Sequence, residues 1–154
     1  MVTKPQIFQT TQSGCTFYYK DVDHKYLHRK DGPAALYNNG GKEWWVNGKR
    51  HRDNGPAIIT ALGSKSWYTH GRQHRDGGPA VIWFDGEQEW HHNGKLHRLD
   101  GPAREWKTME RFFVNGVEYT AQQFPKAVAN YISYVEITKR ELQAIFGDYR
   151  VVEW

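Results

Sequence analysis

The chain has 154 residues, of which 38% are hydrophobic, 15% aromatic and 25% charged, with a net charge of +4. This length suits one domain, and the excess of rings over aliphatic side chains favours a thin sheet over a thick aliphatic core. The charge is too small to indicate a nucleic-acid partner by itself, and no apolar run is long enough for a membrane span. The single cysteine excludes an internal disulfide framework and, without an apolar leader, predicts a cytoplasmic location.

One seven-residue motif occurs four times at a fixed interval. The copies begin at His28, His51, His74 and His97, and each continues with Arg and ends in Gly-Pro-Ala. Successive copies are 23 residues apart. A degenerate fifth copy over residues 115–119 comes one residue early, and a half-unit over residues 17–19 precedes the first copy. A fixed period of this length predicts an array of like structural units.

Each unit contains two short apolar or aromatic runs and two turns. Pairs such as Asn47-Gly48 and Asp85-Gly86 supply the positive φ that tight hairpins require. Glycine and proline recur too often for a helix, and Pro56 and Pro79 belong at the start of strands. The repeats, about residues 16–119, therefore predict a mainly β fold: a single-layer antiparallel β-meander of 23-residue hairpin repeats.

Alternation along the strands predicts two rows of rings on opposite faces. The first row is nearly uniform, and we expect it to form the packed face with Trp67 buried at its centre. Its members are Trp44, Trp67, Trp90 and Phe112. The second row is aromatic but mixed in polarity, which is typical of a surface that meets a partner. Its members are Trp45, Tyr68, His91 and Phe113.

Residues 120–154 leave the repeat and predict a cap of one or two helices and a final strand over residues 149–154. Apolar residues at helical spacing begin at Phe124 and end at Val135. Thr120 with Gln123 predicts one capping box, and Thr138 with Glu141 predicts a second helix start, with Gly147 as its stop. This short helical cap either covers the open end of the sheet or lies across the second row. Residues 1–14 are expected to cover the other end, within a sheet domain of residues 1–119.

Residues 90–97, Trp-His-His-Asn-Gly-Lys-Leu-His, resemble the core of a MORN repeat, which also forms one hairpin per unit. The chain departs from ordinary MORN units by having His-Arg-x-Asp-Gly-Pro-Ala where they have His-Gly-x-Gly. This variant resembles repeats in small proteins of bacteria, bacteriophages and large viruses. The resemblance covers about residues 16–120. It implies a scaffold or a protein- or lipid-binding surface and, for a phage protein, a partner in the host cytoplasm.

The repeated motif also invites a catalytic interpretation, because His51-Arg52-Asp53 matches the tripeptide of a kinase catalytic loop. The chain lacks a Gly-rich phosphate loop and is too short for a kinase. A catalytic site is made once, whereas this motif occurs four times. We therefore expect a structural turn in which Asp or Asn bonds backbone N–H groups and His and Arg link adjacent units. The prediction is that the protein is not an enzyme and has no catalytic residues.

Eight histidines raise the question of a metal site. Equivalent histidines of neighbouring units should lie about 10 Å apart, because each unit adds two strands about 4.8 Å apart. A metal needs its ligands about 2 Å from one centre. His70, His91 and His92 lie close in sequence, but no carboxylate or cysteine accompanies them at ligand spacing. We therefore predict no metal and no other cofactor.

Arg52, Arg75 and Arg98 should form a basic row beside the second row of rings. These seven residues are the predicted partner-binding site of a non-catalytic module whose partner is a protein. The alternative is nucleic-acid or nucleotide binding and sequestration on the aromatic-basic face, or in a pocket between the sheet and the tail helix. We expect nearby aspartates to neutralise the arginines and weaken nucleic-acid binding. The oligomeric state stays open.

Overall fold

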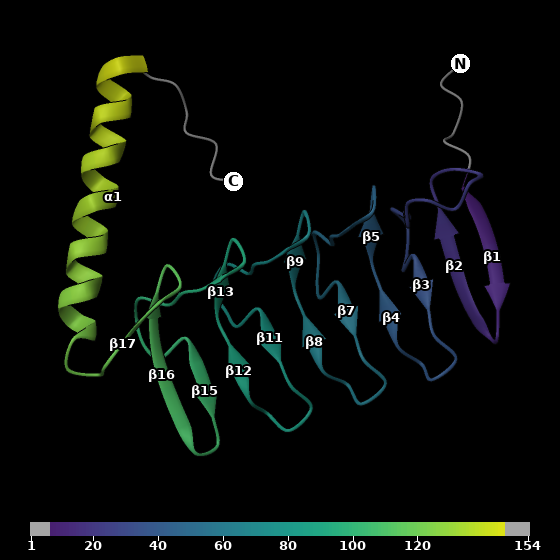
Figure 1. Ribbon diagram of the computed structural model, residues 1–154, viewed down its shortest axis with the longest axis horizontal. Coiled ribbons are helices and arrows are strands. Elements are labelled where there is room, and N and C mark those ends of the chain that lie inside the picture. The colour runs from purple at the N-terminus through teal and green to yellow at the C-terminus, as the bar shows by residue number, and fades with distance from the viewer. Residues whose placement is uncertain (1–6, 147–154) are drawn as a thin grey trace.

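The computed structural model describes residues 7–146, which form an antiparallel meander sheet followed by one helix (Figure 1). Eleven strands follow one another in chain order across the sheet. They are β1 (Phe8–Gln12), β2 (Cys15–Tyr19), β3 (Ala35–Leu36), β4 (Lys42–Glu43), β7 (Ile58–Ile59), β8 (Lys65–Ser66), β11 (Val81–Ile82), β12 (Gln88–Glu89), β15 (Arg104–Trp106), β16 (Met109–Val114) and β17 (Val117–Tyr119). The predicted fold class is confirmed. The predicted strand over residues 149–154 and the stop at Gly147 lie outside the described residues.

Three short hairpins continue the strands beyond the sheet, and we call them the tip hairpins. They are β5 (Trp45–Val46) with β6 (Lys49–Arg50), β9 (Tyr68–Thr69) with β10 (Arg72–Gln73), and β13 (His91–His92) with β14 (Lys95–Leu96). Asn47 and His70 in their turns have φ of 50° and 49°, as the predicted turns require. The chain leaves the sheet at Trp67, whose N–H donates to the Ala80 carbonyl at 2.8 Å. Each repeat therefore has a sheet half and a tip half.

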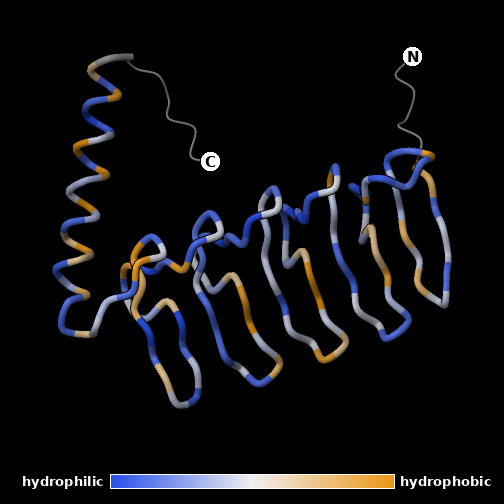
Figure 2. The backbone as a smooth tube through the Cα atoms, viewed as in Figure 1, coloured by the Kyte–Doolittle hydropathy of each residue, from blue (hydrophilic) through white to orange (hydrophobic). Residues whose placement is uncertain are grey.

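The buried core consists mainly of alanines rather than of the tryptophans that we expected. The motif alanines Ala34, Ala57, Ala80 and Ala103 are all 0% exposed. The first row of rings, including Trp67, is only half-buried, so the prediction of a packed face is wrong. The physical reason is that a single-layer sheet has no second layer to cover large rings. Figure 2 shows short hydrophobic runs separated by hydrophilic segments along the whole array.

The tail forms one helix, α1 (Phe124–Phe146), which is 23 residues long. The predicted capping box at its start is confirmed, because the Thr120 N–H donates to Gln123 Oε1 at 3.1 Å and the Gln123 N–H donates to Thr120 Oγ1 at 3.3 Å. The predicted second start at Thr138 is wrong. Thr138 Oγ1 instead donates to the Tyr134 carbonyl at 2.9 Å, a bond that a hydroxyl makes without ending a helix.

α1 stands at the C-terminal end of the sheet, far from β5 (Figure 1). The ring of Phe124 lies 4.9 Å from that of Phe112, and the ring of Tyr131 lies 5.0 Å from that of His97. The helix therefore covers the end of the array and does not hide Trp45. At the other end, β1 pairs with β2 along five residues. Among residues 7–146, no helix combines the length and apolar character that a membrane crossing needs.

Candidate binding surface on the tip hairpins

The motif arginines are held within their own repeats. The guanidinium carbon of each lies over the ring of the first-row tryptophan, at 3.9 Å for Arg52 on Trp44 and 4.0 Å for Arg75 on Trp67 and Arg98 on Trp90. Each Nη1 also donates to the carbonyl of the motif proline, at 3.1 Å for Arg52 and Arg75 and 3.2 Å for Arg98. Stacking on a ring and donation to a carbonyl stabilise the turn. These three predicted binding residues therefore have a structural role.

The rest of Gly-Pro-Ala follows from the position of this arginine. A Cβ placed on Gly78 would lie 3.2 Å from the guanidinium carbon of Arg75, which is tighter than an ordinary contact. Glycine therefore leaves room for the guanidinium, Pro79 supplies the carbonyl that it bonds, and Ala80 fits a position that is 0% exposed. The motif is a packing unit, which supports its structural interpretation.

The motif histidines join successive repeats. Each Nδ1 accepts a backbone N–H from the turn of the next tip hairpin or of β16–β17. The pairs are Asn47 to His28 at 3.1 Å, His70 to His51 at 3.3 Å, Asn93 to His74 at 3.1 Å and Asn115 to His97 at 2.9 Å. An acceptor nitrogen carries no proton, so these contacts select the neutral ring with its proton on Nε2. The expected link between units is thus made by histidine.

The motif aspartate pairs with the side chain two residues before it. That side chain is arginine or histidine, because the aspartate occupies the fourth position of the motif in some repeats and the third in others. Asp100 pairs with Arg98 Nε at 2.7 Å, and Asp76 pairs with His74 Nε2 at 3.3 Å. The hydrogen bond from Arg98 holds the pKa of Asp100 below its usual range. We expected the aspartates to bond backbone N–H groups and to neutralise the arginines, and Asp76 instead bonds a histidine.

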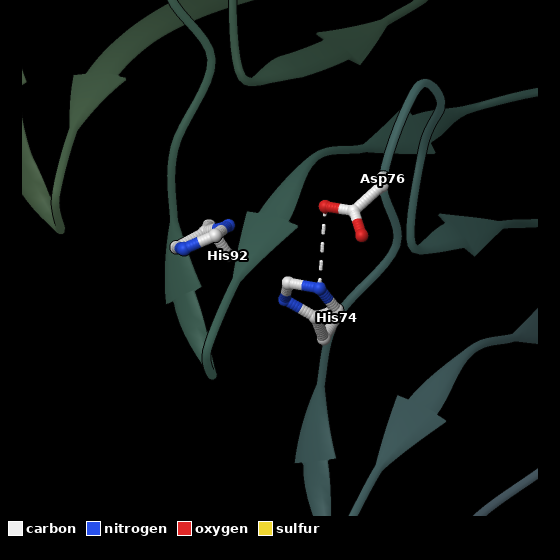
Figure 3. A group of neighbouring side chains, drawn as sticks. All are labelled: His74, Asp76 and His92. Carbon is white, nitrogen blue, oxygen red and sulfur yellow. Dashed lines mark ion pairs between the residues drawn. The ribbon is translucent and has the colours of Figure 1, made fainter. Parts of the chain in front are cut away.

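His74, Asp76 and His92 come together at the third repeat (Figure 3), and their candidate ligand atoms lie within 4.8 Å of one another. Spacing along the chain does not reveal this cluster, because two of its members belong to one repeat and the third to the next. His92 comes from the next repeat, where it occupies the position that Thr69 has one repeat earlier. A carboxylate therefore does accompany His92, contrary to our expectation.

Hydrogen bonding makes this cluster a poor metal site. The Asn93 N–H donates to His74 Nδ1, so the neutral ring carries its proton on Nε2, which faces Asp76. A metal at Nε2 needs the opposite arrangement, with the proton on Nδ1 and donated outward. Binding would therefore cost the bond that joins two repeats. His51 and Asp53 form the same pair at 3.1 Å one repeat earlier, which also indicates a structural pair.

The second row divides into an internal half and an accessible half. His91 and Phe113 are buried, at 9% and 8% exposed. His91 Nε2 lies 3.0 Å from Glu89 Oε2, and this hydrogen bond lowers the pKa of Glu89. Glu89 therefore matches one ring nitrogen of His91 inside the protein, whereas the buried Nδ1 has no hydrogen-bond partner among residues 7–146. Trp45 and Tyr68 are half-buried and are the ring residues of this row that a partner would reach.

A groove of about 440 Å³ lies between the first two tip hairpins, and we call it the tip groove. Its lining residues are Trp45, Gly48, Lys49, Arg50, His70, Gly71 and Arg72. The guanidinium carbon of Arg50 lies 4.8 Å from the Trp45 ring centroid and 5.6 Å from that of Tyr68. None of the lining residues is acidic. Arg50 is paired with Glu43 at 3.5 Å, so the ring of Trp45 and the cations Lys49 and Arg72 make this groove suited to a negatively charged group with an apolar neighbour.

Exposed cations extend from the tip groove along the array, one per repeat, and we call Lys49, Arg72 and Lys95 the basic ladder. The stem of each lies against the turn glycine of the next repeat, with its Cβ 3.6 Å from a Cβ built on Gly71, Gly94 or Gly116. Within residues 7–146, no ion pair engages them. These three cations are not among the predicted site residues, although each directly follows the glycine of a tip turn.

A larger groove of about 890 Å³ lies between β17 and α1, where a nucleotide pocket was an open alternative. Its rings are Tyr119, Tyr131 and Tyr134. Lys126 is among its lining residues and no arginine is, so the arginine expected to hold phosphate is not in this lining. Positive charge is concentrated at the tip groove, which we take as the candidate site.

Comparison with known proteins gives no family: no family model, no curated protein and no solved structure matches this chain. The resemblance to MORN repeats therefore stays a prediction, and function is argued from the geometry.

Proposed function

We propose that this protein is a non-catalytic binding module that holds a partner protein at the tip groove and the basic ladder. One observation carries the proposal: the exposed cations of the basic ladder, which form no ion pair with any residue from 7 to 146, lie beside two accessible rings, Trp45 and Tyr68. Regular presentation of the same groups is typical of repeat proteins that bind extended partners. A MORN-like scaffold is consistent with this use.

We propose a non-catalytic role because the histidine and arginine of the motif are engaged in hydrogen bonds and stacking that stabilise the fold. His74 has one ring nitrogen bonded to the next repeat and the other facing Asp76, and Arg75 is stacked and bonded to Pro79. His51 and Arg52 repeat this arrangement with Asp53 and Pro56. His97 keeps the bond from the next repeat, but Asp100 pairs with Arg98 there. A catalytic base needs a nitrogen available for a substrate proton, and these hydrogen bonds leave little freedom for that role.

The partner is expected to be acidic at the contact. Lys49 and Arg72 line the tip groove, so the partner would supply carboxylates there and an apolar side chain against Trp45. Tyrosine, tryptophan and arginine are the side chains that most often anchor protein interfaces. If the viral resemblance holds, that partner is a host protein in the cytoplasm.

The test is capture of partners from a nuclease-treated lysate of cells that produce the protein. A protein band retained by the wild type and lost with Trp45→Ala/Tyr68→Ala supports the proposal. The matched control is Trp83→Ala/Phe84→Ala, which removes two rings that are 44% and 64% exposed in the turn between β11 and β12 and should keep the band. Equal capture by all three proteins, or capture of no protein, contradicts it.

Binding of single-stranded nucleic acid or a nucleotide is the second candidate, because basic side chains beside rings also suit stacked bases and phosphates. Arg50 between Trp45 and Tyr68 is the observation that favours it. A raised ratio of absorbance at 260 nm to that at 280 nm in protein purified without nuclease would support this candidate. So would release of a small molecule on denaturation.

A further inference from the structure

We propose that the segment of the partner that meets the basic ladder is extended, with a carboxylate at every third residue. One carboxylate would then meet each of Lys49, Arg72 and Lys95. This inference rests on the proposed function and adds the spacing and conformation of the partner.

The fold sets the spacing of the cations. Each repeat adds two strands to the sheet, and neighbouring strands lie about 4.8 Å apart, so equivalent residues recur about every 10 Å. The stem of Arg72 packs against Gly94 just as that of Lys49 packs against Gly71. The first carbons of Lys49, Arg72 and Lys95 thus occupy equivalent places beside the turn glycine of the next repeat, so the side chains recur with the repeat.

A polyproline II segment matches this interval. It rises about 3.1 Å per residue with three residues per turn, so every third side chain returns to the same side after about 9 Å. A β-strand rises about 3.3 Å per residue, but its side chains alternate between two faces. Two side chains three residues apart therefore point to opposite faces, and only one of them would meet the ladder. Charge complementarity favours carboxylates at those recurring positions, because the ladder presents the exposed cations Lys49, Arg72 and Lys95.

A helix with a carboxylate every seventh residue also has a repeat of about 10.5 Å. A helix with side chains is about 10–12 Å across, which is as wide as the interval between tip hairpins. A helix would therefore contact only the ends of the tip hairpins. An extended chain is thinner, so the side chains between its carboxylates can reach Trp45 in the tip groove. The geometry thus favours the extended form.

The experiment measures fluorescence polarisation of labelled peptides with the full chain at low salt. The periodic probe is (Glu-Pro-Pro)₅, and the matched probe has the same composition with its five glutamates adjacent. We expect the periodic peptide to bind at least about tenfold more tightly. Lys49→Ala/Arg72→Ala/Lys95→Ala should abolish that preference. The control Lys42→Ala/Lys65→Ala/Lys107→Ala removes the same charge from other exposed positions and should keep it.

Other outcomes overturn the inference in distinguishable ways. Equal binding of both peptides, or of neither, refutes the spacing but leaves the lysate capture through Trp45 as a separate test of the proposed function. Tighter binding of a helical peptide with heptad-spaced glutamates refutes the extended form. Tighter binding of a (dT)₁₅ oligonucleotide than of either peptide assigns the ladder to nucleic acid. Thermal melts establish that each variant is folded before its binding is compared.

Discussion

The guanidinium of Arg75 covers the indole ring of Trp67, with its carbon 4.0 Å from the ring centroid. The same guanidinium donates to the Pro79 carbonyl at 3.1 Å. A single-layer sheet thus uses a stacked cation where a two-layer protein would use a second apolar layer. This relationship recurs in three full repeats and makes the motif arginines part of the fold.

Arg75→Ala is expected to lower the free energy of unfolding by about 1–3 kcal/mol, because it removes both the cation–π contact and the bond to Pro79. Arg75→Lys should recover only part of the loss, since an ammonium cannot stack as a planar group. Urea denaturation measures both. Arg72→Ala, at an exposed position three residues earlier, is the control and should cost less than about 0.5 kcal/mol. Equal losses at the two positions would show that the stack contributes nothing.

Gly78→Ala is expected to cost about 1 kcal/mol, because the new Cβ would crowd the guanidinium of Arg75 at 3.2 Å. In an Arg75→Ala background the same change should cost much less, since the group that it displaces is absent. A double-mutant cycle by urea denaturation measures this coupling. Additive costs would mean that the glycine is required for a reason other than the arginine.

Acid is expected to destabilise the array through its histidines. Burial, and then the charges of Lys30 and Lys20, lower the pKa of His28 from 6.5, and burial, and then His92, lower the pKa of His97 from 6.5. Because each folded pKa is below the unfolded value, the unfolded chain binds protons first. The stabilisation is complete above about pH 6.5 and is lost as the pH falls through the folded pKa.

Urea denaturation between pH 7.5 and pH 5 measures this loss. His97→Gln should flatten the dependence, because an amide oxygen can accept the Asn115 N–H without titrating. His24→Gln, at an exposed position, is the control for the substitution itself. A stability that rises between pH 7 and pH 5 would contradict the assignment of neutral, hydrogen-bonded rings.

We expect the protein to bind oligonucleotides weakly, because the motif arginines are not available to contact phosphates. Arg98 is paired with Asp100 and Glu105, and Arg52 is stacked on Trp44, so neither is available to a phosphate. Polarisation of a labelled (dT)₁₅ at about 50 and 200 mM salt measures the affinity and its salt slope. Tight, steeply salt-dependent binding would place nucleic acid ahead of protein as the partner.

The hairpins, the turns and the start of the helix could be predicted from the sequence because they depend on neighbouring residues. Asn47-Gly48 specifies a turn by its positive φ, and Thr120 with Gln123 specifies a helix start by hydrogen bonds across three residues. The same local pattern misled at Thr138, because a hydroxyl inside a helix can bond the preceding turn as well as begin a new one.

Burial and availability were decided only by tertiary structure. We expected Trp67 to be buried and His91 to be accessible, but Trp67 is half-buried and His91 is buried. Trp67 has no second layer to cover it, and Glu89 supplies a buried hydrogen-bond partner for His91. The identity of the available cations also changed from Arg75 to Arg72. Both are arginines within one repeat, but only the first has a ring and a carbonyl placed against it by the folded turn. A repeat in sequence therefore determines which groups recur, whereas the contacts made in the folded turns determine which of them are available to a partner.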